Sequence, residues 1–144
     1  MSFPVALPPR IPLGPRQYVL ARAAGILARR ISATTPQLNR AMAVLQQGAG
    51  RLSTAAETEH AVLAVCTADL RLGGTRACLP RSVAALLYCR AQGHTPALVI
   101  GIRPGTAQVH AWLEAEGRPA GEPNDPTRIY TPITRYSPRK KWNP

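Results

Sequence analysis

The spacing of apolar residues changes its period once along this chain, at Gly93, and this change constrains the fold. Before Gly93, apolar residues recur every three to four positions, as they do on one face of a helix. After it, 97–102 is a short β-branched run, and 107–114 alternates with the period of two that is typical of a strand. A turn at 103–105 separates the two runs. The pattern predicts helices first and a small antiparallel sheet second, an α+β domain.

Two helices are predicted in the first third of the chain. The first runs from about Arg16 to Ser32. The second begins at a capping Thr35 and stops at Gly48 and Gly50. The apolar residues that recur at helical spacing in the first helix are Val19, Leu20, Ala23 and Leu27.

Two more helices are predicted before the sheet. Thr54 and Glu57 form a capping box that starts the third helix. Pro80 fits the first turn of the fourth, which Gly93 ends. Cys78 therefore falls at the start of the fourth helix.

The length of 144 residues predicts one domain with its own core. We place this domain at 16–134, between a Pro-rich N-terminal arm at 1–15 and a basic tail at 135–144. No apolar run approaches the length of a membrane span, and the start lacks the apolar core of a signal peptide. These features predict a cytoplasmic protein that does not bind a membrane.

Three cysteines, Cys66, Cys78 and Cys89, cannot all pair with one another, so we expect free thiols in a reducing compartment. The chain has no Cys-x-x-Cys pair and no histidine pair at ligand spacing. We therefore expect neither a structural metal nor a cofactor.

The formal net charge of +11 comes almost entirely from arginines scattered along the chain. Phosphate binding is one interpretation of such a charge. No helix carries a dense basic stripe, however, and no aromatic residues interleave with the arginines, which argues against nucleic acid. An arginine-rich composition without a specific role, and a surface that attracts an acidic peptide or partner protein, remain as alternatives.

Cys78 and His110 are the candidate catalytic residues. A sulfur at a helix start faces unpaired backbone N–H groups and the positive end of the helix dipole, and both favour the nucleophilic thiolate. His110 lies on the polar-looking face of the strand that follows, alongside Trp112. If this strand packs near the fourth helix, the imidazole can act as the base for the thiol. Cys66 and Cys89 lie inside helices, where a cysteine is usually a buried apolar side chain.

A carboxylate is expected to hold the imidazole in place. A three-residue turn ending at Gly117 would put His110 opposite Glu122, whereas a two-residue turn would put Pro123 there. We favour Glu122 as the third member of the site, with Asp125 as the alternative acid.

Three sequence blocks taken together resemble the leader peptidase of lasso peptide biosynthesis, in its split, transglutaminase-like form. The resemblance covers about Ala56 to Asp125, and Glu116-Gly117 and Gly121-Glu122 add to it. The blocks are Cys78-Leu-Pro-Arg-Ser-Val, Leu98-Val-Ile-Gly-Ile-Arg and Val109-His-Ala-Trp-Leu-Glu.

The resemblance implies a papain/transglutaminase-like fold and a Cys-His-acid triad in which Cys78 matches the nucleophile and His110 the base. Family members commonly have aspartate at the position that matches Glu122, so this glutamate departs from the pattern. The substrate implied is a ribosomally made precursor peptide, whose leader is removed before a separate cyclase closes the macrolactam. A separate leader-recognition protein is implied as a partner, and the cyclase is a further candidate partner.

Two other functions remain open on the sequence. A transglutaminase-like acyltransferase would use the same three residues and pass the acyl group to an amine. A basic peptide-binding or nucleic-acid-binding module would carry out no chemistry, and its binding to nucleic acid would depend steeply on salt.

Overall fold

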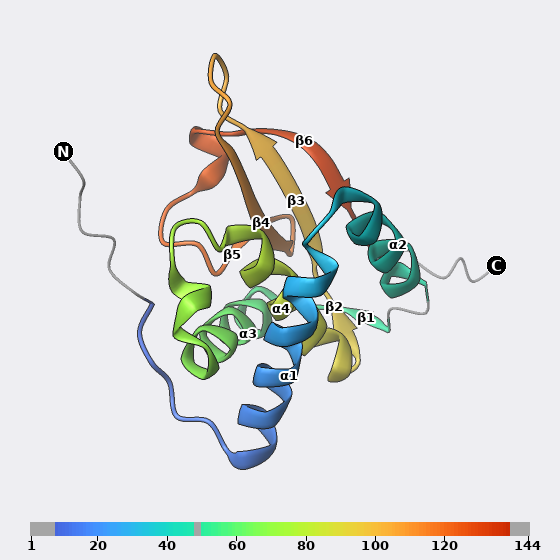
Figure 1. Cartoon of the computed structure of the whole chain (residues 1–144), viewed down its shortest axis with the longest axis vertical. Helices are drawn as coiled ribbons and strands as arrows, with labels where there is room; N and C mark the ends of the chain where they lie inside the picture. Colours follow the sequence, from blue (N-terminus) through green and yellow to red (C-terminus); the bar gives the residue numbers. More distant parts are fainter. Residues whose placement is uncertain (1–7, 48–49, 139–144) are drawn as a thin grey trace.

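The computed structural model describes residues 8–47 and 50–138. Four α-helices come first and a four-stranded antiparallel sheet follows, so the α+β prediction is confirmed (Figure 1). The helices are α1 (Pro15–Ile31), α2 (Thr35–Gln46), α3 (Ala55–Ala68) and α4 (Cys78–Ala91), with short 3-10 helices η1 (Leu70–Gly73) and η2 (Pro126–Arg128). The strands are β1 (Arg51–Leu52), β2 (His94–Thr95), β3 (Ala97–Ile102), β4 (Val109–Ala115), β5 (Arg118–Ala120) and β6 (Thr131–Tyr136).

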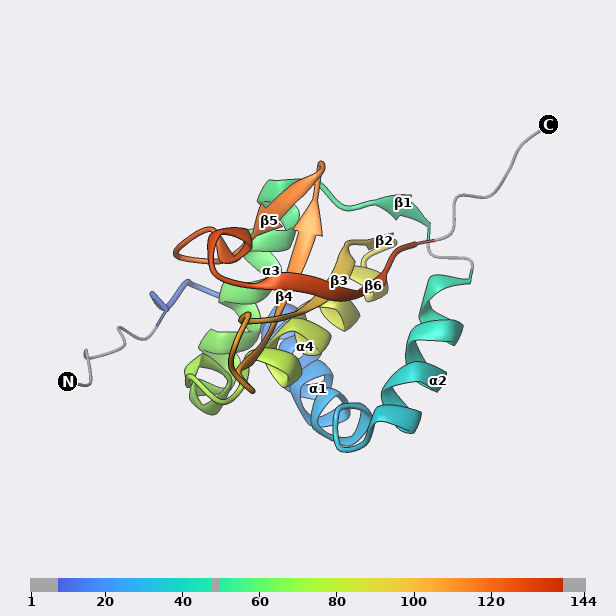
Figure 2. The ribbon, with the colours of Figure 1, turned by 90° about the horizontal axis from the view of Figure 1, so that it is seen from above.

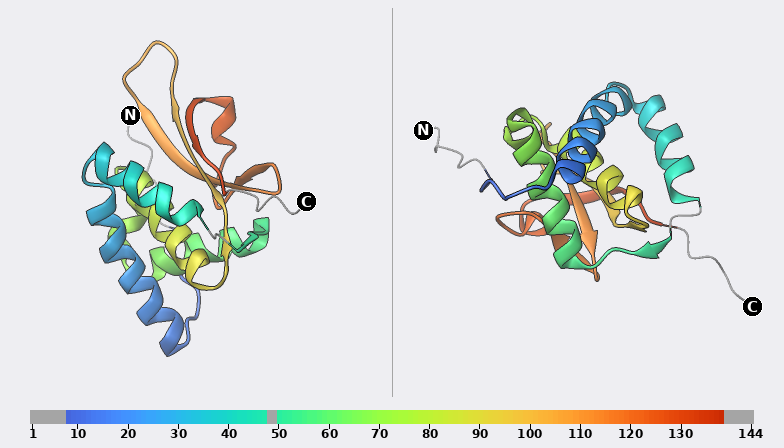
Figure 3. Two further views of the ribbon diagram at one scale, coloured as in Figure 1. Left: turned by 90° about the vertical axis from the view of Figure 1, so that its right-hand side faces the viewer. Right: turned by 90° about the horizontal axis from the view of Figure 1, so that it is seen from below.

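Helix α4 is the centre of the molecule. It packs against α1 and α3 and against β3 and β4, so that α1 and the sheet lie on opposite sides of it (Figures 2 and 3). Its buried residues Val83, Ala84 and Leu86 belong to the one hydrophobic core that we find in the described residues. Its first residue, Cys78, lies beside β4, where its thiol interacts with the backbone of Ala111.

The sheet has the order β5-β4-β3-β6, and β1 and β2 form a separate short parallel pair. Strands β5 and β6 are thus opposite edges, although they are consecutive in the chain. Residues 121–130 connect them, and this connection leaves β5 just past Ala120 and enters β6 at Thr131, which pairs with Ile102. Its second end lies where β4 begins, beside the Ile102–Val109 pair, whereas its first end lies opposite Leu113, four residues further along β4.

The predicted helix starts agree with the structure in two cases and differ in one. Thr54 and Glu57 form the capping box of α3, and α4 begins at Cys78. The cap of α2 is Thr34 rather than Thr35, since the Thr34 side chain accepts the hydrogen bond from the backbone N–H of Gln37. Gly48, predicted to stop this helix, lies outside the described residues.

Of the four residues whose spacing predicted α1, Leu20 packs against the core, but the other three are exposed. Val19 and Leu27 are 66% and 48% exposed, and the buried residues are the small Ala21, Ala24 and Ala28. The periodicity did indicate a helix, but two different faces of α1 satisfy it. Small side chains let α1 approach α4 closely, and this packing selects the alanine face over the larger residues.

The chain ends are described only in part. Residues 1–7 of the predicted arm and 139–144 of the predicted tail lie outside the described residues. Strand β6 starts at Thr131 and continues through Tyr136, two residues into the predicted tail. Among the described residues, no helix combines the length and the apolar character needed to cross a membrane.

Candidate active site

Cys78 is the first residue of α4, and its thiol is free and half-buried. No side chain caps this helix start, so the N–H groups of the first turn are left to other partners. Burial alone would raise the pKa of the thiol, but hydrogen bonds with His110 and with the backbone of Ala111, and the charge of Arg81, more than offset it. The net effect lowers the pKa of Cys78 and favours the thiolate.

In the other two cysteines the pKa of the thiol is shifted in the opposite direction, upward. Burial raises the pKa of the Cys66 thiol to about 11 and that of the Cys89 thiol to about 12. Both residues lie inside helices and are buried, at 4% and 0% exposed. These two thiols stay protonated at neutral pH, and only Cys78 has the properties of a nucleophile.

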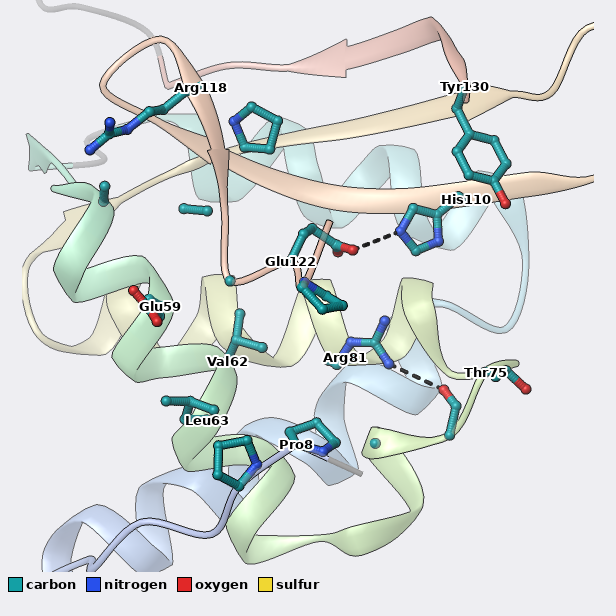
Figure 4. Close-up of a pocket in the computed structure, with 18 residues that line it drawn as sticks. Pro8, Glu59, Val62, Leu63, Thr75, Arg81, His110, Arg118, Glu122 and Tyr130 are labelled. Atoms are coloured by element: carbon teal, nitrogen blue, oxygen red, sulfur yellow. Dashed lines mark hydrogen bonds and ion pairs between the residues drawn. The ribbon is translucent and has the colours of Figure 1, made fainter. Parts of the chain in front are cut away.

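His110 lies in β4 between the thiol and a carboxylate. Its Nε2 atom is 3.1 Å from Oε2 of Glu122 (Figure 4), and the imidazole also forms a side-chain hydrogen bond with Cys78. Hydrogen bonding to Cys78, and then to Glu122, raises the pKa of His110 to about 9 against the opposing effect of burial. The raised pKa of the imidazole and the lowered pKa of the thiol together favour a thiolate–imidazolium pair.

The carboxylate reaches the imidazole by a route that the sequence did not predict. The turn has two residues, Glu116 and Gly117, both with positive φ, so the expected three-residue turn is wrong. Continuing this register would put Pro123 opposite His110. Strand β5 instead ends at Ala120, and the chain turns at Gly121, where φ is 79°. That turn brings the Glu122 side chain to the imidazole.

The early end of β5 also leaves room for α4. Pairing between β4 and β5 stops at Leu113 and Ala120, so the backbone of Ala111 has no partner in β5. Two side chains of α4 contact the backbone of Ala111 instead. The thiol of Cys78 interacts with it, and the Ser82 hydroxyl donates to its carbonyl at 3.3 Å. Cys78 and Ser82 are one helical turn apart, which fixes the start of α4 against β4.

Two aromatic rings hold the imidazole from its faces. The Trp112 ring lies 5.9 Å from the His110 ring with an interplanar angle of 23°, and the Tyr130 ring lies 5.1 Å away at 28°. The strand face that looked polar in the sequence is therefore covered, and Trp112 is fully buried. Tyr130 comes from the connection between β5 and β6, which supplies Glu122 as well.

The other carboxylates near the hairpin bond elsewhere. Asp125, the alternative acid, accepts hydrogen bonds from the backbone and hydroxyl of Thr127, where it caps η2. Glu114 pairs with Arg135 at 2.8 Å, and Glu116 accepts from the backbone N–H of Ala55. Among the described contacts, Glu122 is the carboxylate that reaches His110.

Two residues of the site, Ser82 and Tyr130, were given no role from the sequence, and Arg81, expected only as a positive charge near Cys78, also makes backbone contacts. The Arg81 guanidinium donates to the carbonyls of Leu72 and Gly74, both at 3.1 Å, and so fixes the segment that leads into α4. Ser82 could have been found from its spacing of four from Cys78. Nothing in the sequence pointed to Tyr130, because its place depends on the path of a whole connection.

A cavity of about 880 Å³ adjoins the imidazole. Figure 4 shows His110 and Tyr130 at one end, with Glu59 and Arg118 at the other. Its middle is lined by apolar groups of α3 and β5, including Val62 and Ala120. The Cys78 side chain is not part of its wall but lies beside it, next to His110 and Arg81, which are. Its volume lies within the range of roughly 300–1,000 Å³ that is typical of ligand-binding clefts.

The remaining histidines, His60 and His94, make contacts in other parts of the fold. His94 bonds through Nδ1 to the hydroxyl of Ser53 at 2.7 Å and through Nε2 to Glu57 at 3.3 Å. His60 lies against the ring of Tyr88. No group of three metal-ligating side chains comes together within residues 8–47 and 50–138.

A comparison with known protein families matches residues 20–135 to the Transglutaminase-like superfamily. Comparisons with curated proteins and with solved structures gave no match. The family match includes all of α2 to β5 and most of α1 and β6, and within it lie Cys78, His110 and Glu122. Since it spans far more than half of the chain, the protein belongs to the transglutaminase-like superfamily.

Proposed function

We propose that the protein is a cysteine peptidase that removes the leader from a ribosomally made lasso precursor peptide. Cys78 is the nucleophile, His110 the acid and base, and Glu122 the carboxylate that orients the imidazole. Membership of the transglutaminase-like superfamily supports acyl chemistry at a cysteine. The three sequence blocks that resemble the lasso leader peptidases carry the choice of substrate.

One observation carries the proposal: a thiol with a lowered pKa contacts an imidazole whose pKa is raised to about 9. A neutral Cys–His contact would leave the thiol a weak nucleophile at pH 7. Here the proton resides on His110, where the Glu122 carboxylate stabilises it. The same proton is then available to the leaving group.

The acylation step follows from this geometry. The Cys78 thiolate attacks the carbonyl carbon at the leader–core junction, and the carbonyl π electrons move to the oxygen. The unpaired N–H groups at the start of α4 are suitable donors to this oxyanion. The C–N bond then breaks, and the His110 imidazolium gives its proton to the amine of the core peptide. The leader remains as a thioester on Cys78.

Deacylation returns the enzyme to its starting state. The imidazole of His110, now neutral, takes a proton from a water molecule as the oxygen attacks the thioester carbonyl. The C–S bond breaks, the leader leaves as a free acid, and the thiolate–imidazolium pair is restored. Hydrolysis by this route uses only the side chains of the site and water.

The proposed partners follow from the same resemblance. The precursor peptide occupies the cavity beside His110, a separate leader-recognition protein delivers it, and the macrolactam-forming cyclase receives the core. A cytoplasmic location fits three cysteines that are all free thiols.

The test is cleavage of a leader-bearing precursor peptide, with and without the leader-recognition protein, read by mass spectrometry. We expect a free leader acid and a core peptide with a new amino terminus. Cys78→Ala and His110→Ala should abolish cleavage, while Cys66→Ala and Cys89→Ala should keep it. Leader joined to an added amine would instead identify an acyltransferase. Cleavage by Cys78→Ala would exclude this site altogether.

A substrate-free measurement separates the chemistry of the site from the choice of substrate. Iodoacetamide should alkylate Cys78 at neutral pH faster than an ordinary thiol, because its pKa is lowered, and His110→Ala should slow this reaction. Cys66 and Cys89 are internal controls that should not react in the folded protein. Fast alkylation without peptide cleavage would retain the nucleophile and reject the lasso precursor as its substrate.

A further inference from the structure

Helix α1 presents its large apolar side chains to solvent. Val19, Ile26 and Leu27 are 66%, 55% and 48% exposed, while its alanines face the core. Large apolar side chains exposed singly are common, but several on one helix mark a contact surface. Leu27 lies where α1 approaches α2, whose Val44 is also exposed, at 69%.

These two helices form the sides of a groove, and α4 forms its floor. Helices α1 and α2 splay apart from their short connection (Figure 2), and the groove between them has a volume of about 510 Å³. The residues of its apolar lining are Leu27, Ile31, Ala41, Val44, Leu45 and Leu87. We call this the α1–α2 groove.

The α1–α2 groove is separate from the cavity beside His110. Its floor residue, Leu87, is nine positions after Cys78 in α4, or roughly 13 Å along the helix axis. No residue lines both hollows. An occupant of the groove would thus leave the thiol and imidazole accessible.

The charges around the groove indicate the chemistry of that occupant. Arg30 and Arg40 line it, no acidic residue does, and neither arginine forms an ion pair with another described residue. The acids of the fold are largely engaged with cations elsewhere, as at Glu57, Asp69, Glu114 and Glu122. A second copy of this chain would bring arginines against arginines and a net charge of +11 against +11.

We propose that the α1–α2 groove binds an amphipathic helix of a partner protein, with its apolar face between α1 and α2 and its carboxylates on Arg30 and Arg40. A third helix laid between two splayed helices buries the exposed leucine and valine in the way that helix-in-groove complexes do. This inference does not depend on the proposed function, because it uses no residue of the Cys78 site.

The probe is a fluorescent amphipathic peptide of about 18 residues with leucines at helical spacing on one face and glutamates on the other. Two control peptides have the same composition in scrambled order, or lysines in place of the glutamates. Fluorescence anisotropy measures binding to the full chain. We expect the acidic amphipathic peptide to bind, and each control to bind at least roughly tenfold more weakly.

Matched variants locate the binding on the protein. Leu27→Glu and Val44→Glu should weaken binding at least roughly tenfold, whereas Val19→Glu, also exposed on α1 but outside the groove, should change it little. Arg40→Glu should weaken it, and Arg16→Glu should not. Circular dichroism confirms that each variant is folded.

Three outcomes would overturn the proposal. Equal binding of the scrambled peptide would mean that charge alone attracts it. An equal effect of Val19→Glu would place the contact elsewhere on α1. A dimer of the free protein in light scattering that Val44→Glu dissociates would make the groove a contact between copies of this chain.

Discussion

At the scale of single residues, the site depends on where one proton resides. His110 lies between Cys78 and Glu122, and these contacts favour the thiolate of Cys78 and the imidazolium of His110. A carboxylate next to an imidazole both fixes the ring orientation and stabilises the imidazolium. The consequences of removing each neighbour can therefore be read as changes in the pKa of His110.

Substitutions of the two candidate acids, Glu122 and Asp125, should have clearly different effects. Glu122→Gln removes the charge beside Nε2, so we expect the pKa of His110 to fall below about 9 and peptide cleavage to fall on the order of 10²-fold. Asp125→Asn alters only a cap of η2 and should leave the pKa of His110 and the rate of cleavage nearly unchanged. NMR titration of the His110 ring gives the pKa, and mass spectrometry gives the rate. Equal losses in the two variants would reject Glu122 as the orienting carboxylate.

Tyr130 should raise the pKa of His110 through its aromatic ring and not through its hydroxyl. A ring stacked on an imidazolium stabilises the cation by about 0.5–1 kcal/mol, so Tyr130→Leu should lower the pKa of His110 from about 9 to roughly 8.5. Tyr130→Phe keeps the ring and should keep the pKa. The same NMR titration measures both variants. A fall of the same size in Tyr130→Phe would assign the effect to the hydroxyl instead.

How well these residues could be predicted varies with the distance along the chain that each contact spans. Cys78 was placed by local signals, a proline in a first turn and a glycine at the helix end, and these survive in the structure. The prediction for His110 depended on one further condition, that its strand packs on the fourth helix. Glu122 was named from a hairpin register that proved wrong, and it reaches His110 because β5 ends early at Ala120. Predicting the place of Tyr130 would have required the path of the whole connection from β5 to β6.

At the scale of elements, α1 shows what periodicity leaves undecided. A helical pattern that admits two apolar faces does not say which one is buried, because the choice depends on how closely the partner helix approaches. Here Ala21, Ala24 and Ala28 meet the core, and larger residues remain outside. A glycine on the same face, Gly25, has the side chain of Leu72 only 3.3 Å from where a Cβ atom would lie.

This inversion predicts opposite effects at neighbouring positions of α1. Ala28 is fully buried, so Ala28→Leu overpacks the core and should lower the free energy of unfolding by about 1–3 kcal/mol. Leu27→Gln, at the adjacent exposed position, should change it by no more than about 0.5 kcal/mol. Urea denaturation measures both. The reverse order would place Leu27 in the core and would remove the α1–α2 groove as an exposed surface.

At the scale of the whole molecule, the arginines outnumber the acids, and most of the acids form ion pairs that join one element to another. Asp69 ties α1 to η1 through Arg29 and Arg71, and Glu114 ties β4 to β6 through Arg135. The composition predicted a positive surface, and the fold explains it, because the few carboxylates neutralise contacts between elements. The sequence could not show which arginines remain unpaired, since that depends on which elements become neighbours.

The folded molecule also carries a second histidine whose charge state matters, and it acts on stability. His94 is 4% exposed and joins β2 to Ser53 and Glu57, with Arg51 nearby. Burial, opposed by Glu57 and reinforced by Arg51, lowers the pKa of His94 below its ordinary value of 6.5. The neutral ring is therefore the form that the fold favours.

The stability should fall on the acid side for this reason. Since the folded pKa of His94 lies below the unfolded value, its contribution to the free energy of unfolding is complete above pH 6.5 and is lost as the pH falls towards the folded pKa. His110 does not offset this loss, because a pKa raised to about 9 contributes stability that is already complete below pH 6.5. Urea denaturation between pH 7 and pH 5 should show the decline in the native chain and a smaller one in His94→Gln. An equal decline in both would mean that another group titrates on unfolding, and that the bridge from β2 to α3 does not depend on a neutral His94.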